Sequence, residues 1–319
     1  MQAGVENDSQ YALPAVRRAV LSLALCALLA GCGDAAGGDD RPTVVATTTQ
    51  AADLARNVAG DRARVVGLLQ PNSDPHDYEV RPDDVKALAD ADLVVRSGGE
   101  LDGWLDGAID SSGANAPQIT LGDHVDPLPG DHGEPDPHWW HDPRNAARAV
   151  AALEDALAAA DPAGKEAYAR NAAAYGRRID ALDQAVARCL DRIPPARRKL
   201  VTTHDSLAYY AHRFGLDVVG AVIPSRSTLA QPSAGEIADL IATIRREGVR
   251  AIFAESSVNP EVEQAVARES GAAVGRPLWA DTLGPRDSDG ATYLASIAAN
   301  TRAIADGLSG GAVRCDLPA

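Results

Sequence analysis

The feature that most constrains the fold is one helical stripe of apolar side chains near the middle of the chain. Its members follow one another at spacings of seven, four, three, four, three and four: Tyr168, Tyr175, Ile179, Leu182, Val186, Cys189 and Ile193. These spacings place side chains on one face of an α-helix. They predict an unbroken helix from about Lys165 to Arg192, roughly 40 Å long, which Pro194 and Pro195 stop. A coiled-coil dimer is the rival interpretation, but the Ala-rich flanks lack its charge pattern, so we expect a monomer.

On both sides of this helix, short apolar runs alternate with helical stretches. The runs VVATTTQ, RVVGLLQ and DLVVRSGG precede it, and KLVTT, LDVVGAVI and VRAIFAE follow it. Strands that alternate with helices form largely parallel sheets. We therefore predict an α/β protein with a first lobe over 43–164, a rigid connecting helix over 165–193 and a second lobe over 194–319.

The N-terminus has the pattern of a lipoprotein signal peptide over 1–31. Arg17 and Arg18 precede the apolar run AVLSLALCALLAGC, which is too short to span a membrane and ends in small residues before Cys32. We expect a lipid on Cys32 and a flexible polar tether over 32–42. The protein would then be extracytoplasmic, either lipid-anchored to the cell membrane or periplasmic.

Cys189 and Cys315 are the two cysteines that remain beyond Cys26 in the signal peptide and the lipidated Cys32. In an oxidising compartment they can form a disulfide. The sequence gives no distance between them, so a disulfide and a buried free pair both stay open.

The composition restricts the ligand. The chain has one Met, two Phe and a net charge of −15. A pocket lined by methionine or aromatic groups for a large apolar ligand is therefore not expected. An acidic surface disfavours nucleic acid and favours cations, although net charge alone defines no site.

Polar residues that follow predicted strands are the candidates for a site, because ligands of parallel sheets bind beyond the carboxyl ends of strands. Four stand out: His76, His138, His204 and Asp281. Three imidazoles and one carboxylate suit tetrahedral Zn²⁺, whereas Mn²⁺ prefers more oxygen ligands. Any one of these residues alone is more often an ordinary hydrogen-bonded or surface residue than a ligand. It is their shared placement that indicates a metal site.

Several segments, in order, resemble one known family. The segments are DPHDYEV (74–80), DPHWWHDP (136–143), TTHDSLAYYAHRFGL (202–216), QPSAGEI (231–237) and IFAESSVNP (252–260). They are similar to those of the zinc and manganese type (ZnuA/TroA-like) of metal-binding solute-binding proteins of ABC importers. The resemblance covers roughly 43–319.

The resemblance implies a transition metal held in the interlobe cleft by His76 and His138 of the first lobe and His204 and Asp281 of the second. Relatives that prefer manganese tend to have a carboxylate in place of His204, so zinc is implied here. The expected function is capture of Zn²⁺ and delivery to an ABC membrane permease, without catalysis. A soluble metallochaperone is a further candidate partner.

Other residues near these motifs keep several interpretations. Glu255 is the rival of Asp281 as the carboxylate ligand, and Asp136, Asp142 and Asp205 are candidates to orient imidazoles. His141 replaces a residue that is usually apolar in the family. It could contact a metal-binding side chain without binding the metal itself, it could bind the metal transiently during transfer, or it could simply precede a helix cap. The acidic stretch with His124 and His132 resembles a short metal-catching loop, or is an ordinary solvated loop.

Three other functions compete with zinc import. Manganese or another divalent ion could be the cargo, and a metal-binding surface adhesin is a second alternative. A secreted metallohydrolase is not favoured, because the sequence has no H-E-x-x-H motif. If three histidines bind the metal, the affinity should fall as the pH drops through about 6.5.

Overall fold

The computed structural model describes residues 1–4, 40–130 and 133–318. Contacts separate Met1–Asp40 from one compact unit, Arg41–Ala319. The predicted signal peptide from residue 5 onward, Cys32 and the tether up to residue 39 lie outside the described residues. Among the helices of the described part, none combines the length and the apolar character needed to cross a membrane.

The first lobe contains a four-stranded parallel sheet in the order β2-β1-β3-β4. Its strands are β1 (Thr43–Ala46), β2 (Arg64–Gly67), β3 (Leu93–Arg96) and β4 (Gln118–Thr120). Its helices are α2 (Thr49–Ala59), α3 (Pro82–Ala89), α4 (Leu105–Ser112) and α5 (Pro143–Ala160). The run VVATTTQ is a strand only as far as Ala46, because the side chain of Thr48 caps the start of α2.

The second lobe has the same strand order in a more fragmented form. Its strands are β5 (Lys199–His204), β6 (Asp217–Ile223), β7 (Ala251–Ile252) and β8 (Ala273–Val274). The pairs β5-β6 and β7-β8 are parallel, and a parallel bridge between Thr202 and Phe253 places β7 beside β5. Its helices are α7 (Ala208–Phe214), α8 (Ala234–Glu247), α9 (Glu261–Ser270) and α10 (Tyr293–Ser309).

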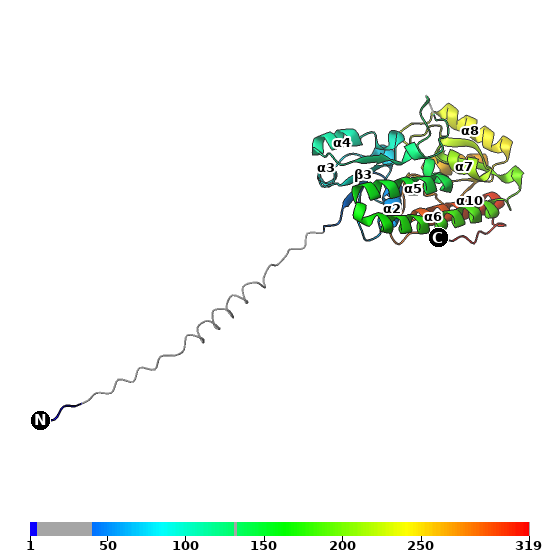
Figure 1. Ribbon diagram of the computed structural model, residues 1–319. Coiled ribbons are helices and arrows are strands. Elements are labelled where there is room, and N and C mark those ends of the chain that lie inside the picture. Colours follow the sequence, from blue (N-terminus) through cyan, green and yellow to red (C-terminus); the bar gives the residue numbers. More distant parts are fainter. Residues whose placement is uncertain (5–39, 131–132, 319) are drawn as a thin grey trace. The chain divides into compact units, whose positions relative to one another are not determined.

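The long helix α6 (Lys165–Leu190) confirms the central prediction from the sequence. The apolar stripe from Tyr168 to Ile193 is buried. It contacts α2, α5 and α10, which run beside it along one side of the molecule (Figure 1). The α/β class with parallel sheets and one long connecting helix is therefore confirmed.

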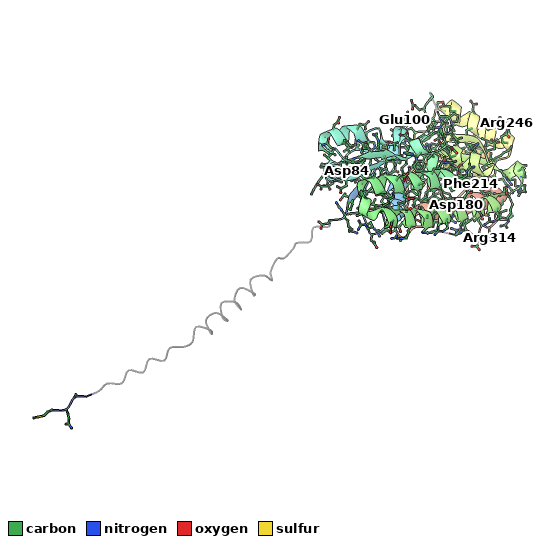
Figure 2. All side chains as sticks on the ribbon, in the orientation of Figure 1. Asp84, Glu100, Asp180, Phe214, Arg246 and Arg314 are labelled. Atoms are coloured by element: carbon green, nitrogen blue, oxygen red, sulfur yellow. A yellow bond between two sulfur atoms is a disulfide. The ribbon has the colours of Figure 1, made fainter. Side chains whose placement is uncertain are left out.

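One apolar core is shared by both lobes. Alternate residues of each sheet point to opposite faces: Val44 and Leu200 join the shared core with α2, α5, α6 and α10. Their neighbours Val45 and Val201 face two separate clusters under the outer helices of each lobe. The side chains that fill these layers are drawn in Figure 2.

A disulfide joins the end of α6 to the C-terminal segment of the chain. Cys189, in the last turn of α6, is bonded to Cys315, with 5.6 Å between their Cα atoms. The pairing that the sequence left open is therefore a disulfide.

Candidate metal centre

Four side chains from four separate segments converge on one point. They are His76, His138, His204 and Asp281. One ligand atom from each lies within 4.8 Å of the others. His76 lies in the 3₁₀ turn η1 (Pro75–Asp77) beyond β2, and His138 directly precedes the turn η5 (Trp139–His141). His204 is the last residue of β5. The structure thus brings together the four residues selected from the sequence.

Three of the distances between these atoms are close to those of a tetrahedral metal shell. Asp281 Oδ2 lies 3.2 Å from Nε2 of His76 and 3.2 Å from Nε2 of His204. The Nε2 atoms of His138 and His204 are 3.4 Å apart. Ligands about 2.0 to 2.1 Å from a tetrahedral zinc ion lie about 3.3 Å from one another. The cluster is almost inaccessible, since the most exposed of these side chains, His76, is 5% exposed.

Two carboxylates orient two of the imidazoles. Asp136 Oδ1 lies 2.7 Å from Nδ1 of His138, and Glu255 Oε1 lies 2.5 Å from Nδ1 of His204. A carboxylate in this place keeps a proton on Nδ1 and directs the Nε2 lone pair to the common point. Two such lone pairs, 3.4 Å apart, repel one another unless a proton or a metal ion lies between them.

The electrostatics of the cluster favour a cation. Burial alone would lower the pKa of His204, but the carboxylates of Glu255 and Asp281 outweigh it and raise that pKa well above its usual value. Burial would raise the pKa of Asp281, but His204 and His138 hold it well below its usual value. Asp281 is therefore ionised, and a metal ion that binds here displaces a proton from His204.

The other candidate carboxylates have different roles. Asp142 caps α5 by accepting the backbone N–H of Arg144, and it pairs with the guanidinium of Arg144 at 2.6 Å. Asp205 Oδ2 lies 3.7 Å from Nη2 of Arg226. The expectation that Asp142 and Asp205 orient imidazoles is therefore not met.

His141 is a buried imidazole that makes no side-chain hydrogen bond within the described part of the chain. It is 1% exposed and directly precedes the cap residue Asp142, and it is not a member of the converging group. Neither ring nitrogen has a hydrogen-bond partner among the residues that the structure describes. Burial, followed by the charge of His138, lowers the pKa of His141 to about 3. His141 is therefore neutral at ordinary pH, and the free-energy cost of removing its imidazole from water is not offset by a hydrogen bond.

The substitution His141→Leu is expected to stabilise the protein by about 1 to 3 kcal/mol at pH 7, because it removes an unsatisfied buried polar group. In unfolded chains this histidine takes a proton below about pH 6.5, whereas in the folded protein it does so only near pH 3. The destabilising effect of His141 is therefore smallest above pH 6.5 and grows as the pH falls toward 3, because protons then bind the unfolded chain preferentially. Urea unfolding at several pH values should show a flatter acid profile for the variant. Equal slopes for both proteins would contradict this account.

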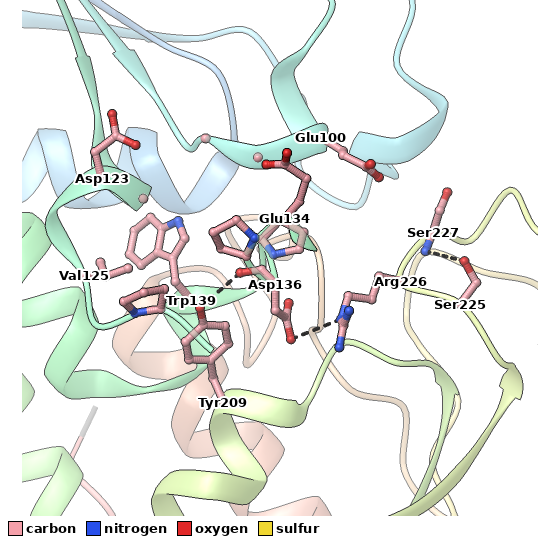
Figure 3. A pocket seen from close by; sticks show the side chains of 16 residues that line it. Glu100, Asp123, Val125, Glu134, Asp136, Trp139, Tyr209, Ser225, Arg226 and Ser227 are labelled. Carbon is pink, nitrogen blue, oxygen red and sulfur yellow. Dashed lines mark hydrogen bonds and ion pairs between the residues drawn. The ribbon is translucent and has the colours of Figure 1, made fainter. Parts of the chain in front are cut away.

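A cavity of about 720 Å³ is lined in part by Asp136 (Figure 3). Glu100 and Glu134 of the first lobe line it, and Arg226 of the second lobe closes it toward Asp136, with Nε 3.5 Å from Oδ2. The acidic stretch predicted to catch metal lies partly at this cavity. His124 is exposed. His132 lies outside the described residues.

The fold and the converging cluster together define a solute-binding protein of the kind that serves metal importers. Residues 44–307 match the family model described as ZnuA, zinc-uptake complex component A, periplasmic. The chain belongs to this family.

Individual relatives are named for different metals. The chain is 32% identical over 268 residues to the iron-binding protein YfeA of Yersinia pestis, covering 83% of this chain and 85% of the relative. It is 30% identical to the manganese-binding lipoprotein MntA of Bacillus subtilis, covering 88% and 95%. The solved structure of the periplasmic zinc-binding protein TroA from Treponema pallidum matches with a TM-score of 0.79 at 28% identity, covering 84% and 99%. Membership of the family therefore does not select the metal.

Proposed function

We propose that this protein captures Zn²⁺ through His76, His138, His204 and Asp281 and delivers it to the membrane permease of an ABC importer. The observation that supports the proposal is the enclosed convergence of three Nε2 atoms and one carboxylate within 4.8 Å of one another, with three of the distances between them at 3.2 to 3.4 Å. Nitrogen-rich sets of this kind suit zinc. No reaction is involved, because all four side chains act as metal ligands and the family is one of transport proteins.

The place of action follows from the N-terminal motif. Several relatives are named as lipoproteins of metal transporters, which supports lipid attachment at Cys32 and an extracytoplasmic location. The permease is then within reach of the tethered protein. Delivery by a soluble metallochaperone is compatible with this arrangement, and a monomer is sufficient for it.

Manganese is the second candidate, and one observation favours it. Both oxygens of Asp281 face the cluster, since Oδ1 lies 3.5 Å from Nε2 of His138 while Oδ2 faces His76 and His204. A bidentate carboxylate would give the higher coordination that Mn²⁺ accepts. Elemental analysis of the purified protein, followed by competition of Mn²⁺ against bound Zn²⁺, decides between them. Displacement of zinc by equimolar manganese would overturn the assignment of zinc.

Binding of Zn²⁺ is expected to release protons and to weaken as the pH falls, starting above pH 6.5. The reason is that the pKa of His204 is raised by Glu255 and Asp281, while a ligand imidazole must lose the proton from its metal-binding nitrogen. Calorimetric titrations in buffers of different ionisation enthalpy count the released protons. An affinity that stays constant between about pH 8 and pH 5 would count against three histidine ligands.

A further inference from the structure

The segment that carries Asp281 is hydrogen-bonded to the first lobe, although in sequence it belongs to the second. The indole Nε1 of Trp140 donates to the carbonyl oxygen of Ala280 at 3.0 Å. The backbone N–H of Leu283 donates to Oγ1 of Thr49 at 2.8 Å. The carbonyl oxygen of Leu283 accepts the N–H of Asn72 at 2.9 Å. Three donors or acceptors of the first lobe therefore bracket Asp281 on both sides.

The hydrogen-bond partners of the backbone change from the second lobe to the first between Trp279 and Ala280. Leu278 still pairs with the second lobe, because its N–H donates to the carbonyl oxygen of Ala254 at 2.8 Å. Trp279 is held by Asn300 of α10, which accepts its N–H and donates to its carbonyl oxygen. From Ala280 to Leu283 the hydrogen-bond partners in the rest of the chain are those of the first lobe, and the N–H of Gly284 again bonds within the second lobe. The backbone at Asp281 is thus a crossing from one lobe to the other.

The start of α10 is fixed to the first lobe in the same way. The hydroxyl of Tyr293 donates to the carbonyl oxygen of Trp140 at 2.8 Å, and its backbone N–H donates to Oδ2 of Asp53 at 3.0 Å. Trp140 therefore contacts the segment of Asp281 through its indole and the start of α10 through its backbone carbonyl. Its ring also lies edge-on to His138, with 5.5 Å between the centroids.

His204 has a different set of supports. Its Nδ1 is paired with Glu255, and the N–H of the next residue, Asp205, donates to the carbonyl oxygen of Ser225 at 3.0 Å. Glu255 in turn donates its backbone N–H to Oγ1 of Thr203. All of these groups belong to the second lobe.

We propose that Trp140 is a positioning residue for Asp281, and that three of the four metal ligands move with the first lobe and one with the second. This inference rests on the proposed function. His76, His138 and Asp281 form one unit with the first lobe, and His204 is the ligand that moves with the second. A tilt of the lobes then breaks the bond to His204 first and leaves a three-ligand site, instead of splitting the four ligands two and two.

The adjacent tryptophans offer a matched test. Trp139 is also 2% exposed, and its Nε1 donates at 3.0 Å as well, but to Ser97 within the first lobe. Phenylalanine at either position keeps an aromatic ring and removes the N–H. Trp140→Phe is expected to raise the dissociation constant for Zn²⁺ by about 10- to 100-fold, as loss of an outer support does. Trp139→Phe should leave that constant at the wild-type value, while both variants lower the thermal stability of the metal-free protein alike.

A second pair of variants separates positioning from general damage. Thr49→Val removes the acceptor of the Leu283 N–H and should weaken Zn²⁺ binding. Thr49→Ser keeps the hydroxyl and should bind Zn²⁺ as the wild type does. The visible spectrum of bound Co²⁺ reports the geometry of the ligands. It should change in Trp140→Phe and Thr49→Val but not in Trp139→Phe or Thr49→Ser.

The outcomes are distinguishable. If wild-type protein binds no Zn²⁺, the proposed function fails and the inference fails with it. If wild type binds but the two phenylalanine variants have the same affinity and the same Co²⁺ spectrum, only the positioning role of Trp140 is overturned. Hydrogen exchange tests the three-to-one division of the ligands between the lobes. Added Zn²⁺ should protect the backbone amides near 204–206 more than those of 280–284. The reverse order would overturn the division.

Discussion

Replacing Asp281 with alanine is expected to raise the dissociation constant for Zn²⁺ by more than about 100-fold, which exceeds the usual cost of losing an outer support. Asp281 supplies the one negative charge among the four converging side chains, and its two oxygens face all three Nε2 atoms. In a cluster that is almost inaccessible no solvent oxygen readily replaces it. Calorimetric or chelator-competition titration measures the loss, and circular dichroism of the metal-free variant checks that it is folded.

The effect of replacing Glu255, which contacts His204 but is not a proposed ligand, is to be compared with that of replacing Asp281. Glu255→Gln keeps the shape beside Nδ1 of His204 but removes the charge, so a loss of about 10- to 100-fold in affinity is expected. Asp205→Asn is the control, since Asp205 is near His204 in sequence but pairs with Arg226. If Asp281→Ala kept full affinity while Glu255→Ala lost it, Glu255 would be the fourth ligand.

Removal of the disulfide, by Cys189→Ser with Cys315→Ser, is expected to lower the free energy of unfolding by about 4 to 5 kcal/mol. The bond closes a loop with a sequence separation of 126, and the chain-entropy cost of such a loop in the unfolded state has this size. Urea unfolding of the double variant, and of the wild type with and without reductant, measures the difference.

The affinity for Zn²⁺ serves as the control for that experiment. Neither cysteine contacts the converging cluster, so the folded double variant should bind the metal as the wild type does. Identical urea midpoints for the oxidised and reduced proteins would contradict the stabilising role of the disulfide.

The parts of the fold that the sequence predicted are those with a clear period. The stripe of α6 repeats every three or four residues because one face is buried and the other is not. The helix α10 has no such stripe and was not predicted from the sequence. Most of its residues are buried, on several faces, so polar positions do not mark a solvent side.

The ligands were also within reach of the sequence, because histidines and an aspartate that follow strands are visible as residue types. Their supports were visible only in part. Asp136 and Glu255 are carboxylates and could be proposed, whereas the Asp281 segment is held through its own backbone atoms at Ala280 and Leu283. Any residue carries such atoms, so no residue pattern predicts where they meet. The pairing of Cys189 with Cys315 stayed open for a related reason, since sequence holds no distance.

The continuous apolar interior beneath both sheets has a consequence for protein engineering. A gene fragment that ended before α6 would encode a polypeptide with the inner surfaces of α2 and α5 bare to water, and such a product would aggregate instead of accumulating as a soluble half. Chimeras between relatives of different metal preference therefore need to exchange loops at the rim of the cluster. Swaps of whole halves would require the interior to be redesigned at the same time.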